Sequence, residues 1–332
     1  MADVQRRREH GRGERVLPGV YRLRVPLPWP GVPHGNAWAV RRGDGFVLFD
    51  CGLPGADNVA ELERALAMCD LELGQANLVV CTHAHLDHCG AAPHIAALTG
   101  CEIYLHPSHA HLLRLLGEPQ ELYEARVANA RRAGLPDELV ETFSPPTPFD
   151  PAGVEPALAA YAAATPLVEG VRFETDVGTW VTHYTPGHSP SHVVLAQPER
   201  RLLVSGDHLL GRISLYFDYG YTPDPCGEFL ASLDLTERLG ARLCLPGHGR
   251  TFADVYAHIR GNRDLVAQRL AEVAEAIADG PRTVYEVIRR VYGEDVSGNI
   301  GWLLAQTESF LTHLQATGRA HADGGDVERW SP

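Results

Sequence analysis

The chain has 332 residues, of which 45% are hydrophobic and 21% are charged, so it can bury a sizeable core. Its 42 acidic residues outnumber its 29 basic residues and give a formal net charge of −13, which disfavours binding to nucleic-acid backbones. No apolar run reaches the length of about 18 residues that a membrane-spanning helix needs, so we expect no membrane span.

The N-terminal stretch and the cysteines indicate the compartment. Residues 1–15 are basic and carry neither an apolar core nor a small-residue cleavage site, so we interpret them as a flexible tail rather than a secretory signal. The seven cysteines are odd in number, irregularly spaced and without a CxxC pair. We therefore expect no disulfide framework and a location in the reducing cytoplasm.

Strands and short helices are predicted over the first hundred residues. Gly19–Leu27 and Ala37–Phe49 have strand character, and the second contains a hairpin turn at residues 42–45. Apolar residues at helical spacing predict a helix over Asn58–Cys69. A buried strand, a helix and a further strand are then predicted at Asn77–Cys81, Ala91–Leu98 and Glu102–Leu105.

The segment from about residue 107 to residue 164 (107–164) has a different character. It is rich in Ala, Leu, Glu and Arg and is interrupted by proline clusters such as Ser144-Pro145-Pro146. It is too long for a simple connection and too helical for a disordered linker. We predict a helical insertion, which is either a lid over the functional site or an oligomer contact.

Strands and helices alternate again after this insertion. Strands are predicted at Thr179–Tyr184, His192–Gln197, Leu202–Ser205 and Arg242–Leu245, and helices at Glu228–Leu239, Ala253–Asp279, Thr283–Tyr292 and Trp302–Thr317. Arg319–Arg329 is a candidate for a small β wing. This order predicts a layered α/β domain over residues 16–253 and a small helical domain over residues 254–332.

The strongest chemical signal is the run THAHLDH at residues 82–88, directly after a predicted buried strand. His83 and His85 are two residues apart in an extended loop, so they point the same way and can share one metal ion. Asp87 and His88 lie beyond the turn and face a second one. Imidazole nitrogens and carboxylate oxygens are suitable zinc donors. A histidine-rich surface loop explains this pattern less well, because the donors follow a hydrophobic strand.

Three more donors stand in glycine-bounded turns after predicted strands. They are His188 in TPGHS, Asp207 in SGDH and His248 in PGHG. In each case a small residue that allows close backbone approach precedes the donor. This shared context predicts that the three complete a two-metal site.

Together these motifs resemble the metallo-β-lactamase superfamily, and within it the glyoxalase II-like branch of hydrolases. The match covers about residues 19–253, with Asp50 in FDCG, the THAHLDH run and the three later donors in the family's order. The resemblance implies a four-layer αββα sandwich, with Asp50 orienting the metal-binding loop. It implies a first metal on His83, His85 and His188, a second on Asp87, His88 and His248, and Asp207 as the bridge.

The implied mechanism is hydrolysis by a hydroxide that bridges two metal ions, since such a pair lowers the pKa of water to near neutrality. Asp87 is the candidate for orienting this nucleophile and moving its proton. Tyr216, Tyr219 and Tyr221 are candidate donors to the developing oxyanion, or else aromatic residues of the core or lid. Two zinc ions are expected, and iron or manganese suits the same donors.

Other activities on this fold fit the residues less well. A secreted β-lactamase normally carries a signal peptide, and many have Cys where this chain has Asp207. Flavodiiron proteins typically have Glu in place of His85. Persulfide dioxygenases do not use the second metal site as such, whereas its expected ligands are all present here.

The segment after Pro281 resembles the small winged-helix-like domain of some β-lactamase-like proteins, among them endoribonucleases. It contains five arginines and seven acidic residues, which argues against a nucleic-acid-binding wing. Packing beside the active-site mouth or at a homodimer contact is the simpler role.

The expected function is hydrolysis of a small acyl compound, with thioesters ahead of lactones and other esters because of the pattern TPGH at residues 185–188. A metal-dependent nuclease or phosphodiesterase is the alternative hypothesis. A catalytically silent scaffold is a third hypothesis, which the intact ligand set disfavours. The chain contains no lysine, so lysine-based recognition of glutathione is absent. The acyl carrier can instead be coenzyme A, a carrier protein or another thiol.

Overall fold

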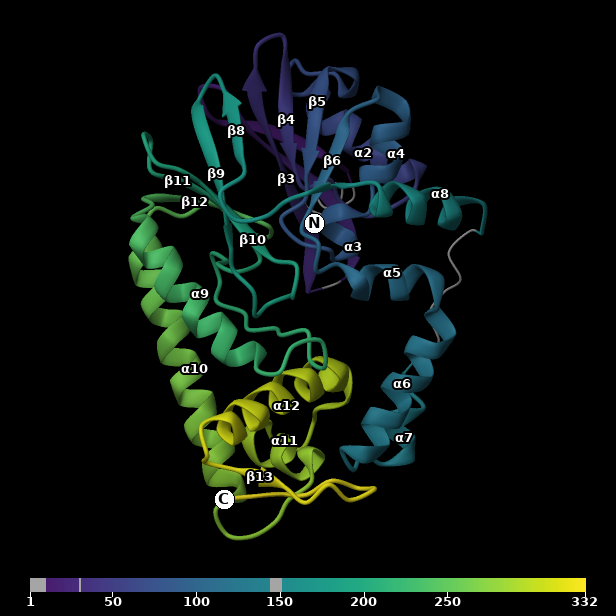
Figure 1. Ribbon diagram of the computed structural model, residues 1–332, viewed down its shortest axis with the longest axis vertical. Helices are drawn as coiled ribbons and strands as arrows, with labels where there is room; N and C mark the ends of the chain where they lie inside the picture. The colour runs from purple at the N-terminus through teal and green to yellow at the C-terminus, as the bar shows by residue number, and fades with distance from the viewer. Residues whose placement is uncertain (1–9, 30, 144–150) are drawn as a thin grey trace, which may run out of the picture.

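Two β-sheets face each other in the computed structural model, which describes residues 10–29, 31–143 and 151–332 (Figure 1). The first sheet runs in the order β1 to β7, and the second in the order β12-β11-β10-β9-β8. The first sheet contains β1 (Arg12–Leu17), β2 (Val20–Trp29), β3 (Val32–Arg42), β4 (Gly45–Phe49), β5 (Ala76–Val80), β6 (Glu102–Leu105) and β7 (Thr165–Pro166). The second contains β8 (Arg172–Thr175), β9 (Gly178–Tyr184), β10 (Val193–Gln197), β11 (Leu202–Gly206) and β12 (Leu243–Pro246).

Strand direction in the first sheet determines where the chain leaves it. Strands β1 to β4 are antiparallel, with Arg42 paired to Gly45 at the predicted hairpin, whereas β4, β5 and β6 are parallel. Parallel neighbours end at the same edge of a sheet. The segments after Phe49 and Val80 therefore emerge side by side, and the backbone N–H of Asp50 donates to Val80 O at 3.0 Å.

Helices cover the outer face of each sheet. On the first sheet lie α2 (Ala56–Ala67), α3 (Leu86–Cys89), α4 (Ala92–Thr99) and the short 3₁₀-helix η1 (Leu73–Gln75), and α9 (Pro225–Leu239) and α10 (Val255–Ile277) lie on the second. Between the sheets a separate cluster buries Trp38, Phe49 and Trp180 completely. The four-layer αββα arrangement implied by the resemblance is confirmed. Among the described residues, no helix is both long and apolar enough to cross a membrane.

The residues expected to form an insertion are helical where the structure describes them. They contain α5 (Ala110–Gly117), α6 (Pro119–Arg132), α7 (Asp137–Val140) and α8 (Pro151–Ala162). The cluster Ser144-Pro145-Pro146 lies outside the described residues. Figure 1 shows α5, α6 and α7 extending from the sandwich toward the C-terminal helices. The side chains of Asn129 and Glu308 connect the two parts by a hydrogen bond of 2.8 Å.

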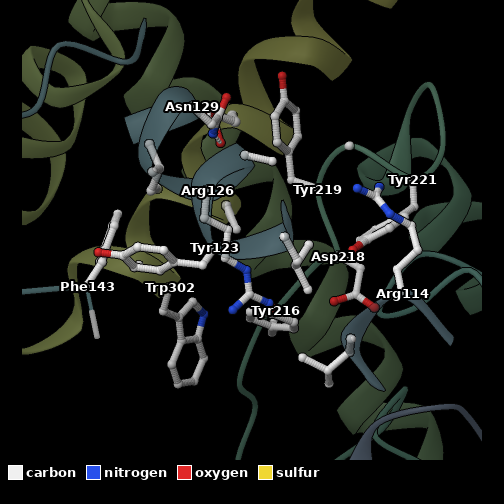
Figure 2. A pocket seen from close by; sticks show the side chains of 18 of the residues that line it. Arg114, Tyr123, Arg126, Asn129, Phe143, Tyr216, Asp218, Tyr219, Tyr221 and Trp302 are labelled. Atoms are coloured by element: carbon white, nitrogen blue, oxygen red, sulfur yellow. Dashed lines mark hydrogen bonds between the residues drawn. The ribbon is translucent and has the colours of Figure 1, made fainter. Parts of the chain in front are cut away.

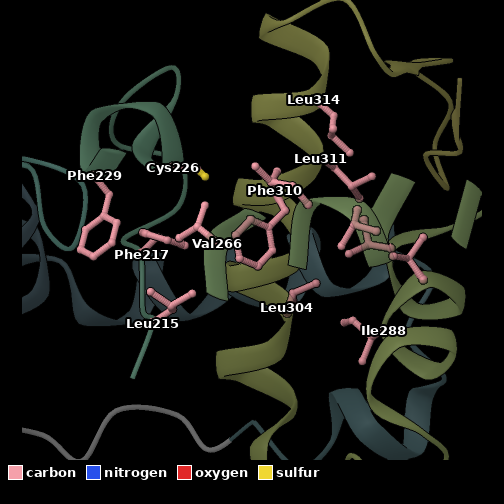
Figure 3. Packing of buried hydrophobic residues seen from close by; sticks show 14 of the residues in the cluster. Leu215, Phe217, Cys226, Phe229, Val266, Ile288, Leu304, Phe310, Leu311 and Leu314 are labelled. Carbon is pink, nitrogen blue, oxygen red and sulfur yellow. The ribbon is translucent and has the colours of Figure 1, made fainter. Parts of the chain in front are cut away.

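The C-terminal segment contains two helices, α11 (Val284–Tyr292) and α12 (Ile300–Ala316), with the 3₁₀-helix η2 (Ser297–Asn299) between them. A capping box formed by Thr283 and Glu286 begins α11. The predicted wing is reduced to one short ladder between β13 (His321–Ala322) and β14 (Trp330–Ser331). One hydrophobic cluster joins α9, α10, α11, α12 and the outer face of the second sheet. Figure 3 shows part of this cluster, including Phe310 and Leu311 of α12 and Val266 of α10. The C-terminal helices thus extend the core of the sandwich.

The predicted flexible tail is wrong for residues 12–15, which belong to strand β1. Glycine explains the difference, because a Cβ at Gly11 would lie 1.8 Å from Glu61 O and one at Gly13 would lie 2.0 Å from Ala65 O. Only a chain without side chains at these positions can pass so close to helix α2. Residues 1–9 of the predicted tail lie outside the described residues.

Candidate metal centre

The loop between β5 and α3 carries four of the expected ligands, and Asp50 holds it in place. Asp50 Oδ1 accepts from the backbone N–H of Thr82 at 2.7 Å, and Asp50 Oδ2 accepts from Thr82 Oγ1 at 2.9 Å. Asp50 has a φ of 58°, a left-handed conformation that aspartate tolerates better than most residues. The preceding Phe49 packs on Trp180 with 5.3 Å between ring centroids. The two sheets therefore fix the position from which Asp50 reaches the loop.

Three histidines form the first group of converging donors. His85 Nδ1 lies 3.0 Å from His83 Nε2 and 3.2 Å from His188 Nε2. His83 and His188 are buried, and they come from opposite sheets of the sandwich. This is the set expected to hold the first metal ion.

The second group lies next to the first. His88 Nε2 and His248 Nε2 are 3.2 Å apart, and Asp87 Oδ2 lies 3.2 Å from His248 Nε2. Asp207 stands between the groups, with Oδ2 3.3 Å from His248 Nε2 and 3.8 Å from His188 Nε2. The seven side chains predicted as ligands thus lie together, with Asp207 between the two groups.

Glycine at position 247 is required for this close packing. A Cβ there would lie 2.2 Å from Asp207 Oδ1 and 2.6 Å from His88 Cε1. The PGHG turn therefore allows His248 to approach the site and leaves space for two other ligands. The backbone N–H of Asn36 also donates to Gly247 O at 2.7 Å, which fixes this turn against β3.

The donor set fits divalent metal ions. Imidazole nitrogens point at one another at 3.0 to 3.2 Å, and Asp207 Oδ1 is buried without a hydrogen-bond partner among the described residues. Buried polar atoms are rarely left unpartnered in proteins. Histidine nitrogen and carboxylate oxygen are the ligands that zinc and similar cations take.

The protonation states also suit cation binding. Burial and the surrounding imidazoles hold the pKa of His83 well below its usual value, so this ring is neutral. Burial disfavours the ionised form of Asp87, but His88 and His248 outweigh it and hold the pKa of Asp87 far below its usual range. Burial alone would lower the pKa of His248, whereas Asp207 and Asp87 raise it to about 10. Ligands must be deprotonated to bind metal, so metal binding at His248 releases a proton.

Most ligand histidines are oriented through their second ring nitrogen. His88 Nδ1 lies 2.9 Å from Asp50 Oδ2, as expected for Asp50. His85 Nε2 lies 2.9 Å from Asp218 Oδ2, and His248 Nδ1 lies 3.1 Å from the backbone oxygen of His34. Sequence reasoning missed both Asp218 and His34. The one signal for Asp218 was its position between the selected tyrosines 216 and 219.

The three candidate tyrosines occupy different positions. The Tyr216 ring lies 5.9 Å from the His85 ring and 5.6 Å from the His188 ring, between centroids. Burial and Asp218 raise the pKa of Tyr216, so its hydroxyl keeps its proton. The Tyr221 ring lies 5.4 Å from that of His111, and Tyr219 turns its hydroxyl away from Asp218 (Figure 2). Of the three, only Tyr216 packs on ligand histidines.

A cavity of about 720 Å³ opens beside Tyr216 and Asp218 (Figure 2). Its walls come from α5, α6 and the residues after α7 on one side and from α12 on the other. Pockets of this size accommodate small organic molecules. The insertion and the C-terminal helix together therefore build a binding space beside Tyr216 and Asp218, which contact candidate metal ligands.

The family model of the metallo-beta-lactamase superfamily matches residues 30–248, which is more than half of the chain. The chain belongs to the metallo-β-lactamase superfamily. It is a hydrolase of this superfamily, whose members generally bind divalent metal ions, and the paired His/Asp groups are where such ions would bind.

Similar proteins agree with this assignment. A metallo-beta-lactamase family protein from Thermus thermophilus superposes with a TM-score of 0.78 at 26% identity, covering 96% of this chain and 99% of that chain. The probable metallo-hydrolase YqjP of Bacillus subtilis is 24% identical over 315 residues, 90% of this chain and 92% of that protein. An atrochrysone carboxyl ACP thioesterase of Aspergillus terreus is 27% identical over 147 residues, 41% of this chain. That match covers 44% of the thioesterase, so this chain spans less than half of that relative's length.

Proposed function

We propose that this metallo-β-lactamase superfamily protein is a dinuclear, zinc-dependent hydrolase that cleaves a small acyl thioester. The observation that carries the proposal is the convergence of seven donor side chains in two adjacent groups that share Asp207. Lactones and other esters are the next candidates, because they contain the same kind of carbonyl centre.

Two divalent cations, when bound, supply a water of lowered pKa and polarise the substrate carbonyl. The chain's own residues prepare this site. Asp87, whose Oδ2 lies 3.2 Å from His248 Nε2, is the candidate for orienting the nucleophile and moving its proton. Asp218 holds His85 at Nε2, so Nδ1 is the nitrogen of His85 that would hold a metal ion.

Tyr216 is the candidate donor to the oxygen that gains charge during the reaction. Its raised pKa keeps the phenol protonated, and its ring already packs on His85 and His188. A donor fixed beside a developing negative charge stabilises the transition state more than the substrate. Tyr219, whose hydroxyl points away from Asp218, is not proposed for this role.

Two observations favour thioesters. Three of the similar fungal proteins are called atrochrysone carboxyl ACP thioesterases. The turn TPGH places His188 in the first donor group, as in the glyoxalase II-like branch to which we assign the chain.

All seven cysteines are free thiols, which is compatible with the reducing cytoplasm that we propose as its location.

The test is release of free thiol from a panel of acyl thioesters by protein loaded with zinc, manganese or iron. Asp87→Ala removes one ligand and the proposed proton acceptor, and His94→Ala changes an exposed histidine outside the site. Thiol release that is lost in Asp87→Ala and kept in His94→Ala supports the proposal. Metal-loaded protein that hydrolyses a lactone or a bis(4-nitrophenyl) phosphate, but no thioester, would show that the thioester assignment is wrong.

A further inference from the structure

The cavity next to the metal centre is strongly aromatic. Six aromatic side chains line it: Tyr123, Phe143, Tyr216, Tyr219, Tyr221 and Trp302. They come from the insertion, from the loop after Asp207 and from α12, so segments far apart in sequence build one surface (Figure 2). Aromatic walls favour flat, apolar ligands, because stacked rings exclude water and bury a large area.

Arginines line the same cavity in a chain whose net charge is −13. Arg132 Nη2 donates to Asn129 Oδ1 at 3.0 Å, and Arg114 Nε lies 3.5 Å from Glu118 Oε2. Arg126 lines the cavity as well, but it forms no hydrogen bond or ion pair with any residue that the structure describes. Its guanidinium is therefore available to a ligand.

Arg126 lies on the same side of the cavity as Tyr216, the aromatic residue that packs on His85 and His188. Figure 2 shows its guanidinium reaching toward Tyr216, on the side of the cavity that contains Trp302. Because Tyr216 packs on His85 and His188, a group bound by Arg126 would be part of the same molecule that reacts at the metals.

The acidic residues of the cavity do not neutralise this arginine. Asp218 is already paired with His85 at 2.9 Å. Glu308 accepts hydrogen bonds from Asn129, and burial raises the pKa of Glu308 to about 8, so this carboxyl is mostly protonated at neutral pH. The cavity thus presents positive charge beside aromatic surface.

On the basis of the function proposed above, we propose that the cavity binds a flat, largely apolar acyl group with a negatively charged substituent, and that Arg126 selects this substituent. The anionic group belongs to the acyl part of the substrate, because the arginine lies in the aromatic cavity beside Tyr216. An anionic group on the leaving thiol, such as a phosphate of coenzyme A, is the competing source of the same charge.

The test compares two thioesters that differ in one carboxylate. The substrates are 4-carboxybenzoyl and benzoyl thioesters of the neutral thiol N-acetylcysteamine, and a third arm uses benzoyl-coenzyme A. The variants are Arg126→Gln, the charge-conserving Arg126→Lys, and Arg131→Gln as a control on the same helix outside the cavity lining. The non-hydrolysable amide analogues of the first two substrates are titrated by calorimetry, so binding is measured whether or not the thioesters react.

For the carboxylated ligand, we expect Arg126→Gln to raise both the KM of the thioester and the Kd of its amide analogue about tenfold, because one charge-assisted hydrogen bond is lost. For the neutral ligand, both values should change less than about twofold. Arg126→Lys should recover part of the loss, and Arg131→Gln should behave as wild type. Equal binding of both analogues by wild-type protein, or an Arg126 effect confined to benzoyl-coenzyme A, overturns the inference. If the carboxylated amide binds through Arg126 but no thioester is cleaved, the proposed function fails and the inference about the cavity stands.

Discussion

His85 Nε2 lies 2.9 Å from Asp218 Oδ2, while its Nδ1 faces His83 and His188. Asp218 therefore determines which nitrogen of His85 is free to bind metal. The backbone N–H of Asp218 donates to His188 O at 3.1 Å, so the same residue contacts two ligands of one group. Residues that hold ligands in this way affect metal affinity without touching the metal.

We expect Asp218→Ala to weaken zinc binding about 10- to 100-fold, as for the loss of other carboxylates that orient histidine ligands. Asp218→Asn should lose less, because an amide oxygen can still accept from His85. Zinc affinity is measured by competition with a chromogenic chelator, and Asp264→Asn on the exposed surface of α10 is the control. Unchanged affinity in Asp218→Ala would show that His85 is held by other contacts.

Asp50 contributes to folding as well as to the site. In Asp50→Ala, the buried N–H and hydroxyl of Thr82 lose their acceptor, and His88 loses its partner. Leaving buried polar groups unpaired costs about 3 kcal/mol or more in total. Urea denaturation of chelator-treated protein measures the free energy of unfolding. A change below about 0.5 kcal/mol, as for ordinary surface substitutions, would contradict this role.

Glu308 predicts a pH dependence of stability. Its pKa rises from the usual 4.5 to about 8 in the folded protein, mainly through burial. Between these values the folded state binds one more proton than the unfolded state, so the stabilisation is complete below 4.5 and is lost as pH rises to 8. Each pH unit inside this window corresponds to about 1.4 kcal/mol per proton.

We expect Glu308→Gln to remove this dependence. The unfolding free energy of the variant should therefore increase relative to wild type between about pH 5 and pH 8, the window set by the raised pKa of Glu308. Denaturant titrations at several pH values measure the unfolding free energy of both proteins. Titratable groups that both proteins share contribute equally, so they cancel in the difference between variant and wild type. Parallel pH profiles of the two proteins would show that Glu308 is ionised in the folded state.

Phe310 connects the C-terminal helix to the loop of the site. Its ring is fully buried and lies 5.7 Å from Phe217, which is adjacent to Asp218 (Figure 3). Phe310→Ala should lower the free energy of unfolding by about 3–5 kcal/mol, because it removes a buried ring and leaves a cavity. Phe310→Leu should cost clearly less. Thermal and urea unfolding of both variants measure this, and a cost below about 1 kcal/mol for the alanine variant would refute it.

The clustering of the candidate metal ligands could be predicted from sequence because most of them stand in short motifs that follow a strand. Strand β6 has the predicted bounds Glu102–Leu105, and the ligand loop follows β5 as expected. The fold brings these strand ends close together, so local patterns were sufficient to predict that His83, His188 and His248 share one site. Tyr219 was a candidate because it follows closely after Asp207, and its hydroxyl points away from Asp218 (Figure 2).

The remaining features depend on contacts between distant segments. Asp218 acquires its role only because its loop folds back onto His85, which is 133 residues earlier in the chain. Arg126 and Trp302 share a cavity because α6 and α12 lie on its two sides. Strand β1 was not predicted because residues 1–15 are basic and contain no apolar run, whereas Gly11 and Gly13 allow this segment to pass close to α2.

The most direct test of the central claim is stepwise zinc titration of metal-free protein, with thiol release from an acyl thioester measured at each step. A dinuclear hydrolase predicts activity that rises to its maximum at two equivalents of zinc per chain, with binding at one group lost in His188→Ala and at the other in His248→Ala. Maximal activity at one equivalent, with no further change at two, would contradict the dinuclear mechanism. No thiol release at any zinc content would contradict thioester hydrolysis itself.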